Sequence, residues 1–298
     1  MTYVNNQPFC PSFLLRRNGE WYRIIAQSEI IGGGFVSCKI TVLLENTAPD
    51  GLEAEHGLSL FVETPESTFI FDCGQTGMAW RNAERLGIRL FSARFVVISH
   101  SHYDHAKGFP SLLGSMKPEA LFTGPGFWRE KFSCDSASGR YIYKGCGFTA
   151  SNLANWGIGH RVCEGILDLD STARLMTGFD MRCPFEKIPE KFRRGRAKAP
   201  DPFDDEVCLL LKEGHGLALV VGCSHRGIVN IVSAVREQTG LPVRRIIGGI
   251  HLDGADRERI EKTLQELDRL GIRESDLGHC SGNAVQKTIS TGSVIELA

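Results

Sequence analysis

Short apolar runs alternate with amphipathic stretches along most of this 298-residue chain. Seven runs of four to six residues are rich in β-branched and aromatic side chains, a composition that favours β-strands. These predicted strands span residues 40–44, 58–63, 68–71, 94–98, 207–212, 217–221 and 243–247. Four stretches with helical periodicity lie between or after them, at residues 79–86, 106–113, 229–238 and 257–270. Strands that pair locally and then alternate with helices predict a layered α/β fold.

Two parts of the chain show weaker patterns. Residues 1–38 end in the glycine run 32–34, and we expect them to form an N-terminal extension packed on or near a catalytic domain of residues 39–298. Residues 122–200 combine several aromatic residues with little periodicity, which predicts loops and short strands over a functional site. The basic stretch 191–198 within them is interpreted as a solvated loop rather than a phosphate-binding tract.

Composition narrows the functional classes. Hydrophobic residues make up 42% and charged residues 23% of the chain, as in ordinary globular domains. The 34 Lys and Arg residues nearly balance the 35 Asp and Glu residues, which argues against a nucleic-acid partner held by bulk charge. No apolar stretch is long enough to span a bilayer, so no membrane partner is expected.

The ten cysteines include no CxxC pair, so a structural zinc ribbon is not predicted. Residues 1–7 also lack a basic segment leading into an apolar one, which predicts a cytoplasmic protein. Thiols stay reduced in that compartment. We therefore expect most of these cysteines to lie in the core or in the functional site.

The strongest chemical signal is the run from His100 to His105, which follows a predicted strand and precedes a predicted helix. It holds three histidines and an aspartate in six residues, donors that suit zinc and also manganese or iron. Residues two apart at a strand end point the same way, so His100 and His102 can hold one ion. After the turn, Asp104 and His105 face a second ion.

Such a loop needs ligands from distant parts of the chain. His225 and His251 each follow a predicted strand, and His279 lies in a similar junction; glycines flank all three. His160 and His215 have weaker contexts and are interpreted as surface residues.

These motifs carry a family resemblance. The run from His100 to His105 resembles the HxHxDH signature of the metallo-β-lactamase superfamily, and Asp72 is similar to its first motif, an aspartate that supports the metal loop. The resemblance implies an αββα sandwich of two mixed sheets flanked by helices, with the site at one edge. From about residue 40 onward the chain is further similar to one branch, which contains the 7,8-dihydropterin-6-methyl-4-(β-D-ribofuranosyl)aminobenzene 5′-phosphate synthases and many metal-dependent hydrolases.

The chain departs from the superfamily's pattern at two ligands. The strand end that would carry a third-motif histidine corresponds to residues 176–180, which contain none. The bridging aspartate of the superfamily corresponds to Cys223, which either binds metal as thiolate or is a small core residue. The sequence predicts a centre with two ions, and the missing bridging carboxylate leaves a centre with one ion as the alternative.

The resemblance, with these departures, implies the following sites. His225 completes the first site with His100 and His102, and His279 completes the second with Asp104 and His105. His251 is either a ligand or a residue that contacts the ligands or the substrate.

The chemistry that follows is metal-dependent hydrolysis or group transfer on a small anionic substrate, phosphorylated and pterin-like in the branch. Zn²⁺ is the expected ion, with Mn²⁺ or Fe²⁺ as alternatives. Asp104 would orient or deprotonate the attacking water, and His251 would donate a proton or a hydrogen bond. Arg226 is an equally balanced candidate for anion binding or for a structural role, whereas Arg129 and Lys131 are interpreted as surface residues. Asn46 and Asn230 are assigned packing or turn roles.

Three other classes remain. A nuclease of the same fold is disfavoured by the charge balance. An iron oxidoreductase with an added flavin domain does not fit within 298 residues. A metal-binding protein without turnover is disfavoured by the intact HxHxDH loop.

A homodimer is compatible with the sequence.

Overall fold

The computed structural model describes residues 14–17, 20–23 and 38–297. The chain divides into two units, Met1–Val36 and Ser37–Ala298. In the first unit β1 (Leu14–Arg17) pairs with β2 (Glu20–Arg23) in antiparallel orientation. The expectation for residues 1–38 otherwise lies outside the described residues.

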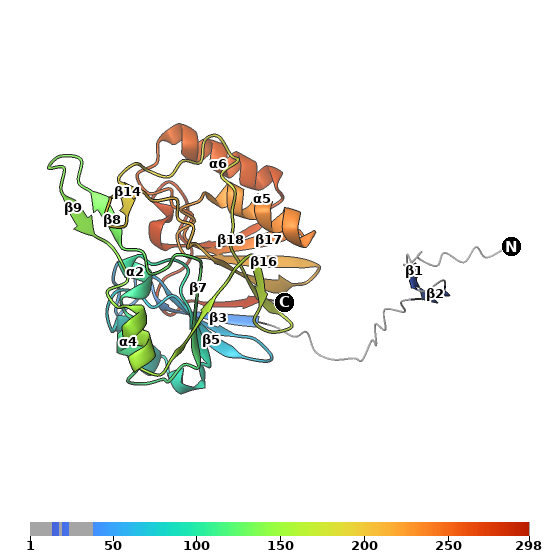
Figure 1. Cartoon of the computed structure of the whole chain (residues 1–298), viewed down its shortest axis with the longest axis horizontal. Coiled ribbons are helices and arrows are strands. Elements are labelled where there is room, and N and C mark those ends of the chain that lie inside the picture. Colours follow the sequence, from blue (N-terminus) through green and yellow to red (C-terminus); the bar gives the residue numbers. More distant parts are fainter. Residues whose placement is uncertain (1–13, 18–19, 24–37, 298) are drawn as a thin grey trace. The chain divides into compact units, whose positions relative to one another are not determined.

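The second unit contains two large mixed sheets (Figure 1). The first has the strand order β10-β7-β6-β5-β4-β3-β19, and the second has the order β11-β12-β15-β16-β17-β18. The strands of the first sheet are Gly159–Val162, Ala120–Thr123, Phe95–Val97, Thr68–Phe71, Ser59–Glu63, Cys38–Leu44 and Val294–Leu297 in that order. Those of the second are Ile166–Asp168, Ala173–Met176, Cys208–Glu213, Gly216–Val221, Val243–Gly248 and Glu274–Leu277.

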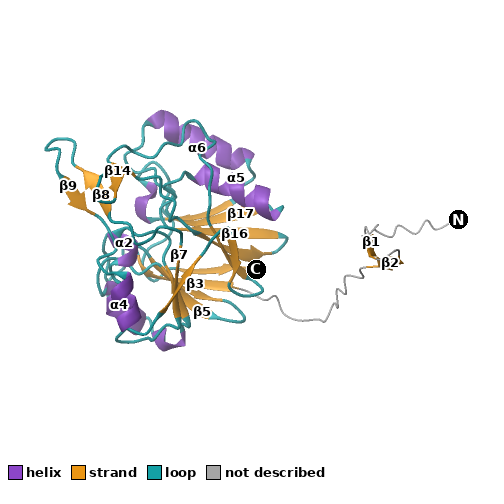
Figure 2. Ribbon diagram, in the orientation of Figure 1, coloured by secondary structure: helices purple, strands orange, loops and turns teal. Residues whose placement is uncertain are grey.

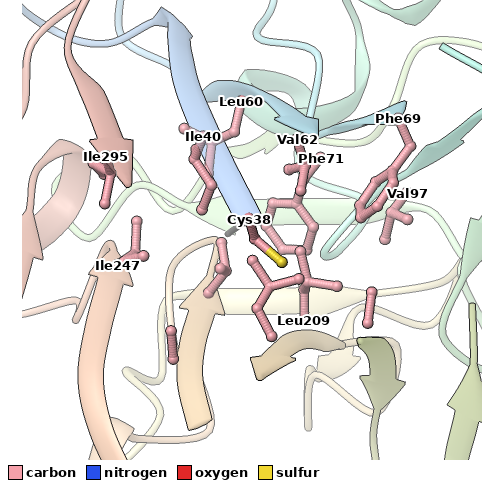
Figure 3. Packing of buried hydrophobic residues seen from close by; sticks show 14 of the residues in the cluster. Cys38, Ile40, Leu60, Val62, Phe69, Phe71, Val97, Leu209, Ile247 and Ile295 are labelled. Carbon is pink, nitrogen blue, oxygen red and sulfur yellow. The ribbon is translucent and has the colours of Figure 1, made fainter. Parts of the chain in front are cut away.

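The main core lies between the two sheets. Ile40 and Val62 of the first sheet share one buried cluster with Leu209 and Ile247 of the second, as Figure 3 shows. Alternate residues of the same strands point outward to the helices, because successive side chains of a strand alternate between its faces. The outer face of each sheet is buried as well.

Helices cover both outer faces (Figure 2). The first sheet is covered by α1 (Met78–Arg85), α3 (Phe109–Leu112) and α4 (Ala150–Asn155), and the second by α5 (Ile228–Thr239) and α6 (Arg257–Arg269). The layers therefore run helix, sheet, sheet, helix, and the predicted αββα sandwich is confirmed.

All seven predicted strands are confirmed to within two residues at their ends. The predicted helix 106–113 is instead two short helices, α2 (Tyr103–Ala106) and α3. Gly108 lies between them and packs so closely that a Cβ there would lie 2.1 Å from the carbonyl oxygen of Cys73. This close approach joins the histidine loop to the end of β5.

The middle of the chain adds a small third sheet of order β14-β13-β8-β9 (Figure 1). Its strands are Ala199–Pro200, Phe192–Arg194, Lys131–Cys134 and Tyr141–Tyr143. We call it the cover sheet. The basic stretch 191–198 was predicted as a solvated loop. That prediction is wrong for residues 192–194, which form strand β13 of this sheet, whereas residues 195–198 form a turn.

Two further expectations concern cysteines and membranes. The nine described cysteines are all free, and seven are buried, as expected for core and site residues. Among the described residues, no helix is both long and apolar enough to cross a membrane.

Candidate metal centre

The candidate site lies where the carboxyl ends of strands from both sheets meet. In the first sheet β5 and β6 are parallel neighbours, followed by Asp72 and by the histidine loop. In the second sheet β16, β17 and β18 run parallel and are followed by Cys223, His251 and His279. Sites in α/β folds form outside such strand ends. The junctions singled out in the sequence therefore converge in space.

The backbone of these junctions is conformationally unusual. Asp72, Ser224, His251 and His279 have φ values of 61°, 59°, 47° and 49°. Non-glycine residues rarely adopt positive φ, and such residues cluster at functional sites where the surrounding structure holds them. Four of the six described examples lie in this one site.

A glycine at one junction allows close packing of the two sheets. A Cβ at Gly222 would lie 2.1 Å from Ser99 Oγ and 3.0 Å from an Asp72 oxygen. Any larger residue would push the Cys223 loop away from the histidine loop. The expected role of the flanking glycines, allowing close approach, is met here.

Three histidine rings form the first group. The ring centroids of His100, His102 and His225 lie 4.8 Å from one another in all three pairings. Nε2 of each ring is buried and has no hydrogen-bond partner among the described residues. A buried polar atom without a partner is costly unless something outside the protein binds it. Convergent, unpartnered imidazole nitrogens are what a metal ion requires.

The protonation state of this group also suits a ligand role. Burial lowers the pKa of His102 to about 3, and burial also holds the pKa of His100 and of His225 well below the usual value. The rings are therefore neutral at physiological pH, and a neutral imidazole is the form that binds metal.

A second group lies beside the first. Nε2 of His105 lies 3.1 Å from Nε2 of His279 and 3.9 Å from an oxygen of Asp104, and that oxygen lies 3.4 Å from Nε2 of His279. Burial by itself would raise the pKa of Asp104, but the adjacent His105 and hydrogen bonds from His279 and His56 outweigh it and hold that pKa well below its usual value. Asp104 is thus an ionised carboxylate.

Cys223 lies between the two groups. Its Sγ is 3.1 Å from Nε2 of His105, and it falls within 4.8 Å of ligand atoms of His100 on one side and of His279 on the other. Cys223 is buried, and burial raises the pKa of its thiol well above the usual value. A ligand that bridges two metal ions, one in each group, would have to lie at this position. Cys280 lies next to it and could also offer sulfur.

Asp72 anchors the histidine loop. One of its oxygens accepts hydrogen bonds from the backbone N–H of Ser99 at 2.7 Å, and the other accepts from the Ser99 hydroxyl at 2.8 Å. The second oxygen also lies 2.6 Å from Nδ1 of His105. The carboxylate therefore keeps the proton of His105 on Nδ1 and leaves Nε2 with a lone pair directed into the site. This position matches the supporting role expected for Asp72.

Two other side chains orient the distant histidines. Oδ1 of Asn46 lies 3.1 Å from Nδ1 of His279, so the packing or turn role assigned to Asn46 is incomplete. Glu206 accepts hydrogen bonds from the backbone N–H of His225 at 2.7 Å and of Arg226 at 2.8 Å, and burial raises its pKa to about 7. Asn46 therefore contacts the imidazole of His279 directly, whereas Glu206 holds the backbone that carries His225.

His56 is a site residue that the sequence reasoning missed. Its Nε2 lies 3.1 Å from the Asp104 oxygen, and its ring centroid lies 4.8 Å from that of His279. The other distant histidines of the site follow strands, whereas His56 precedes β4. Because β4 is antiparallel to β5, its start lies beside the end of β5. Combining strand direction with the histidine positions would have found it.

Two predictions about basic residues change. Lys131, interpreted as a surface residue, has a side chain only 1% exposed, with Nζ 2.7 Å from Asp205 and 2.8 Å from Asp201. That interpretation is wrong because two carboxylates distant in sequence neutralise the buried charge. Arg226 donates to the carbonyl oxygens of Phe179 and Pro202 and does not line the pocket described next, so its position supports the structural role.

A pocket of about 230 Å³ opens onto both groups of ligand atoms. His251 lines it, with its ring centroid 4.2 Å from that of His225, and its Nδ1 is buried without a described partner. Phe192 of the cover sheet lines the pocket as well, and its ring centroid lies 5.1 Å from that of His225. By contrast His160 and His215 are exposed, as expected.

Comparison with known proteins agrees with this geometry. The model of the metallo-β-lactamase superfamily matches residues 52–116, which include Asp72 and the histidine loop. A solved metal-dependent hydrolase of the β-lactamase superfamily superposes with a TM-score of 0.74 and 27% identity, over 88% of this chain and 99% of that one. The chain thus contains a match to the metallo-β-lactamase domain over residues 52–116 and shares the fold of a solved hydrolase of that superfamily. Members of the superfamily are mostly enzymes and typically bind metal ions.

Two more proteins are similar to the chain, one in sequence and one in fold. It is 29% identical over 248 residues to 7,8-dihydropterin-6-methyl-4-(β-D-ribofuranosyl)-aminobenzene-5′-phosphate synthase of Methanocaldococcus jannaschii, covering 77% of this chain and 82% of the synthase. Human tRNase Z, short form, shares the fold with a TM-score of 0.51 and 14% identity, over 87% of this chain and 99% of that one. The similarity to the synthase extends well beyond the histidine loop.

Proposed function

We propose that this protein is a member of the metallo-β-lactamase superfamily and a metal-dependent hydrolase or transferase that acts on a small anionic substrate. One observation carries the proposal. The unpartnered nitrogens of His100, His102 and His225 converge beside the carboxylate and imidazoles of a second group, at the inner end of a pocket.

The donors fit two ions. The first would be held by the three imidazoles just named, and the second by Asp104, His105 and His279. The thiolate of Cys223, which lies between the two groups, would serve both ions and replace the bridging aspartate of other members. Imidazole and thiolate donors together favour Zn²⁺, whereas Mn²⁺ prefers sites richer in oxygen.

When bound, such ions supply a nucleophilic water at neutral pH and neutralise charge on an oxyanion or leaving group. The chain's own residues would do the rest. Oδ1 of Asp104 is buried and has no described partner, so it is free to accept a proton from the attacking water. His56 contacts the other oxygen of Asp104 and would hold the carboxylate in that orientation. His251, at the wall of the pocket, would donate a proton or a hydrogen bond to the leaving group.

The substrate class draws on the synthase from M. jannaschii, whose name describes a pterin-containing phosphate as product. A phosphorylated, pterin-like molecule is accordingly the first substrate to consider. Hydrolysis and group transfer would use the same ligands and differ in which nucleophile occupies the pocket.

The experiment combines metal analysis with a substrate panel. Elemental analysis of the purified protein should find one to two transition-metal ions per chain, and H102A and H225A should lower that content. H215A is the matched control, because His215 lies exposed in the turn between β15 and β16. Phosphodiesters, phosphomonoesters, lactones, thioesters and RNA are then tested with the loaded enzyme. Less than one tightly bound ion per chain, with H102A indistinguishable from the wild type, would overturn the proposal.

A further inference from the structure

The pocket in front of the histidines has a second wall that belongs to the cover sheet. Lys144 follows β9, and Lys191 precedes β13. Both line the pocket, as do His251 and His279 of the main sandwich. Ser133 of β8 lines the same wall. None of these three residues is needed to hold a metal ion.

The two ammonium groups are not neutralised within the protein. Among the described residues, neither Lys144 nor Lys191 has a carboxylate oxygen within salt-bridge distance, whereas the buried Lys131 on the same sheet has two. Lys144 Nζ instead lies 4.7 Å from the ring centroid of Tyr103, and Lys191 Nζ lies 5.2 Å from that of Phe192. Both rings also line the pocket. The lysines therefore border the pocket with their positive charges available.

The other charged groups of the pocket do not cancel this charge. Asp104 faces the histidines, and Asp253 is exposed at the pocket's rim. Arg226, the anion-binding candidate from the sequence, is engaged by main-chain carbonyl oxygens outside the pocket. The available cations on the wall are thus the two lysines.

We propose that Lys144 and Lys191, with the hydroxyl of Ser133, bind a phosphate monoester group of the substrate while its reacting bond lies at the histidine cluster. This inference rests on the proposed function, since it assigns the anion of that substrate to specific side chains. Two ammonium groups and a hydroxyl match the double charge and several acceptor oxygens of a phosphate monoester. A single carboxylate would use only part of this set.

The size of the pocket agrees with a substrate whose phosphate lies at the lysines and whose reacting bond lies at the histidines. At about 230 Å³ it is smaller than the cavities that enclose a whole drug-sized ligand. It accommodates the phosphate and the reacting group, and the remainder of a larger substrate would extend past the rim. The cover sheet would then bind the anion and the sandwich would bind the metal. Mutations in the cover sheet should therefore weaken anion binding without lowering the metal content.

The test titrates inorganic phosphate, and malonate as a dicarboxylate comparison, into the metal-loaded protein by calorimetry. The variants are K144Q, K191Q and the double variant, with K212Q as the matched control because Lys212 is exposed at the end of β15 and does not line the pocket. Elemental analysis and thermal melting accompany each titration. We expect each single variant to weaken phosphate binding about tenfold, and the double variant to weaken it further, with metal content and melting unchanged.

The outcomes separate this proposal from the proposed function. Wild-type phosphate affinity in the double variant with normal metal content would overturn the lysine site and leave the metal centre intact. If the protein takes up no transition metal but binds phosphate in a way that depends on both lysines, the lysine site is supported and the proposed function is overturned. Tighter binding of malonate than of phosphate, or no phosphate binding by the wild type, would overturn the assignment to a phosphate group.

Discussion

Nζ of Lys131 lies 2.7 Å from an oxygen of Asp205, and neither side chain is exposed by more than 1%. The other oxygen of Asp205 accepts hydrogen bonds from the backbone N–H and the hydroxyl of Ser101, at 2.9 and 2.8 Å. Ser101 separates the two histidines His100 and His102. This ion pair therefore joins the cover sheet to the loop that carries the proposed ligands.

Removing the ammonium group should be strongly destabilising. Lys131→Met would leave the carboxylates of Asp201 and Asp205 buried without their cation, which typically costs about 3–5 kcal/mol. Urea denaturation should show this loss in free energy of unfolding. Lys39→Met is the matched control, because Lys39 and Glu63 form an exposed pair worth about 0–1 kcal/mol. Similar values for the two variants would contradict a structural role for the buried cation.

Asp72 should control metal affinity through His105. Asp72→Asn keeps the shape of the side chain but cannot hold the His105 proton on Nδ1 as the carboxylate does. Loss of such a supporting group typically weakens metal binding about 10–100-fold. Competition with a chromophoric chelator measures the change. Asp168→Asn, at an exposed position paired with Arg174, should leave the affinity unchanged. Equal metal affinities in the two variants would show that Asp72 does not support metal binding.

Cys223 should bind the metal as a thiolate. A protein loaded with Co²⁺ should show intense near-ultraviolet absorption from sulfur-to-metal charge transfer, and Cys223→Ser should reduce it strongly. Cys163→Ser provides the control, because Cys163 is equally buried but lies in the core between the sheets. An unchanged band in Cys223→Ser would identify Cys223 as a core residue and leave Cys280 as the source of sulfur.

His251 should act on the substrate rather than hold the metal. With a substrate from the panel, His251→Gln should lower kcat about 100-fold or more, the usual effect of losing a general acid, at unchanged metal content. His160→Gln, at an exposed site away from the pocket, should retain wild-type kinetics. Loss of metal in His251→Gln would instead make His251 a ligand.

Local patterns predicted most of the fold and half of the site. Strands such as β3 and β16 are buried apolar runs with clear ends, and the loop from His100 to His105 places its donors within six residues. The expected positions of His225 and His279 followed from strand ends that the structure brings together. The helix after the loop was predicted as one element because its periodicity continues across Gly108.

The missed residues depend on contacts distant in sequence. Lys131 is neutralised by carboxylates 70 and 74 positions away, so its burial leaves no local pattern. His56 reaches the site because β4 runs antiparallel to β5, and Lys191 reaches it through the pairing of β13 with β8. Each would require the sheet pairing to be known first.

The proposed positions of the two metal ions can be tested by diffraction. Data are recorded from crystals of the metal-loaded protein on both sides of the metal absorption edge. We expect one anomalous peak among the Nε2 atoms of His100, His102 and His225, and a second beside His105, His279 and Asp104. A fully loaded crystal without a peak at the three imidazoles, or with its peaks elsewhere in the molecule, would contradict the proposed positions.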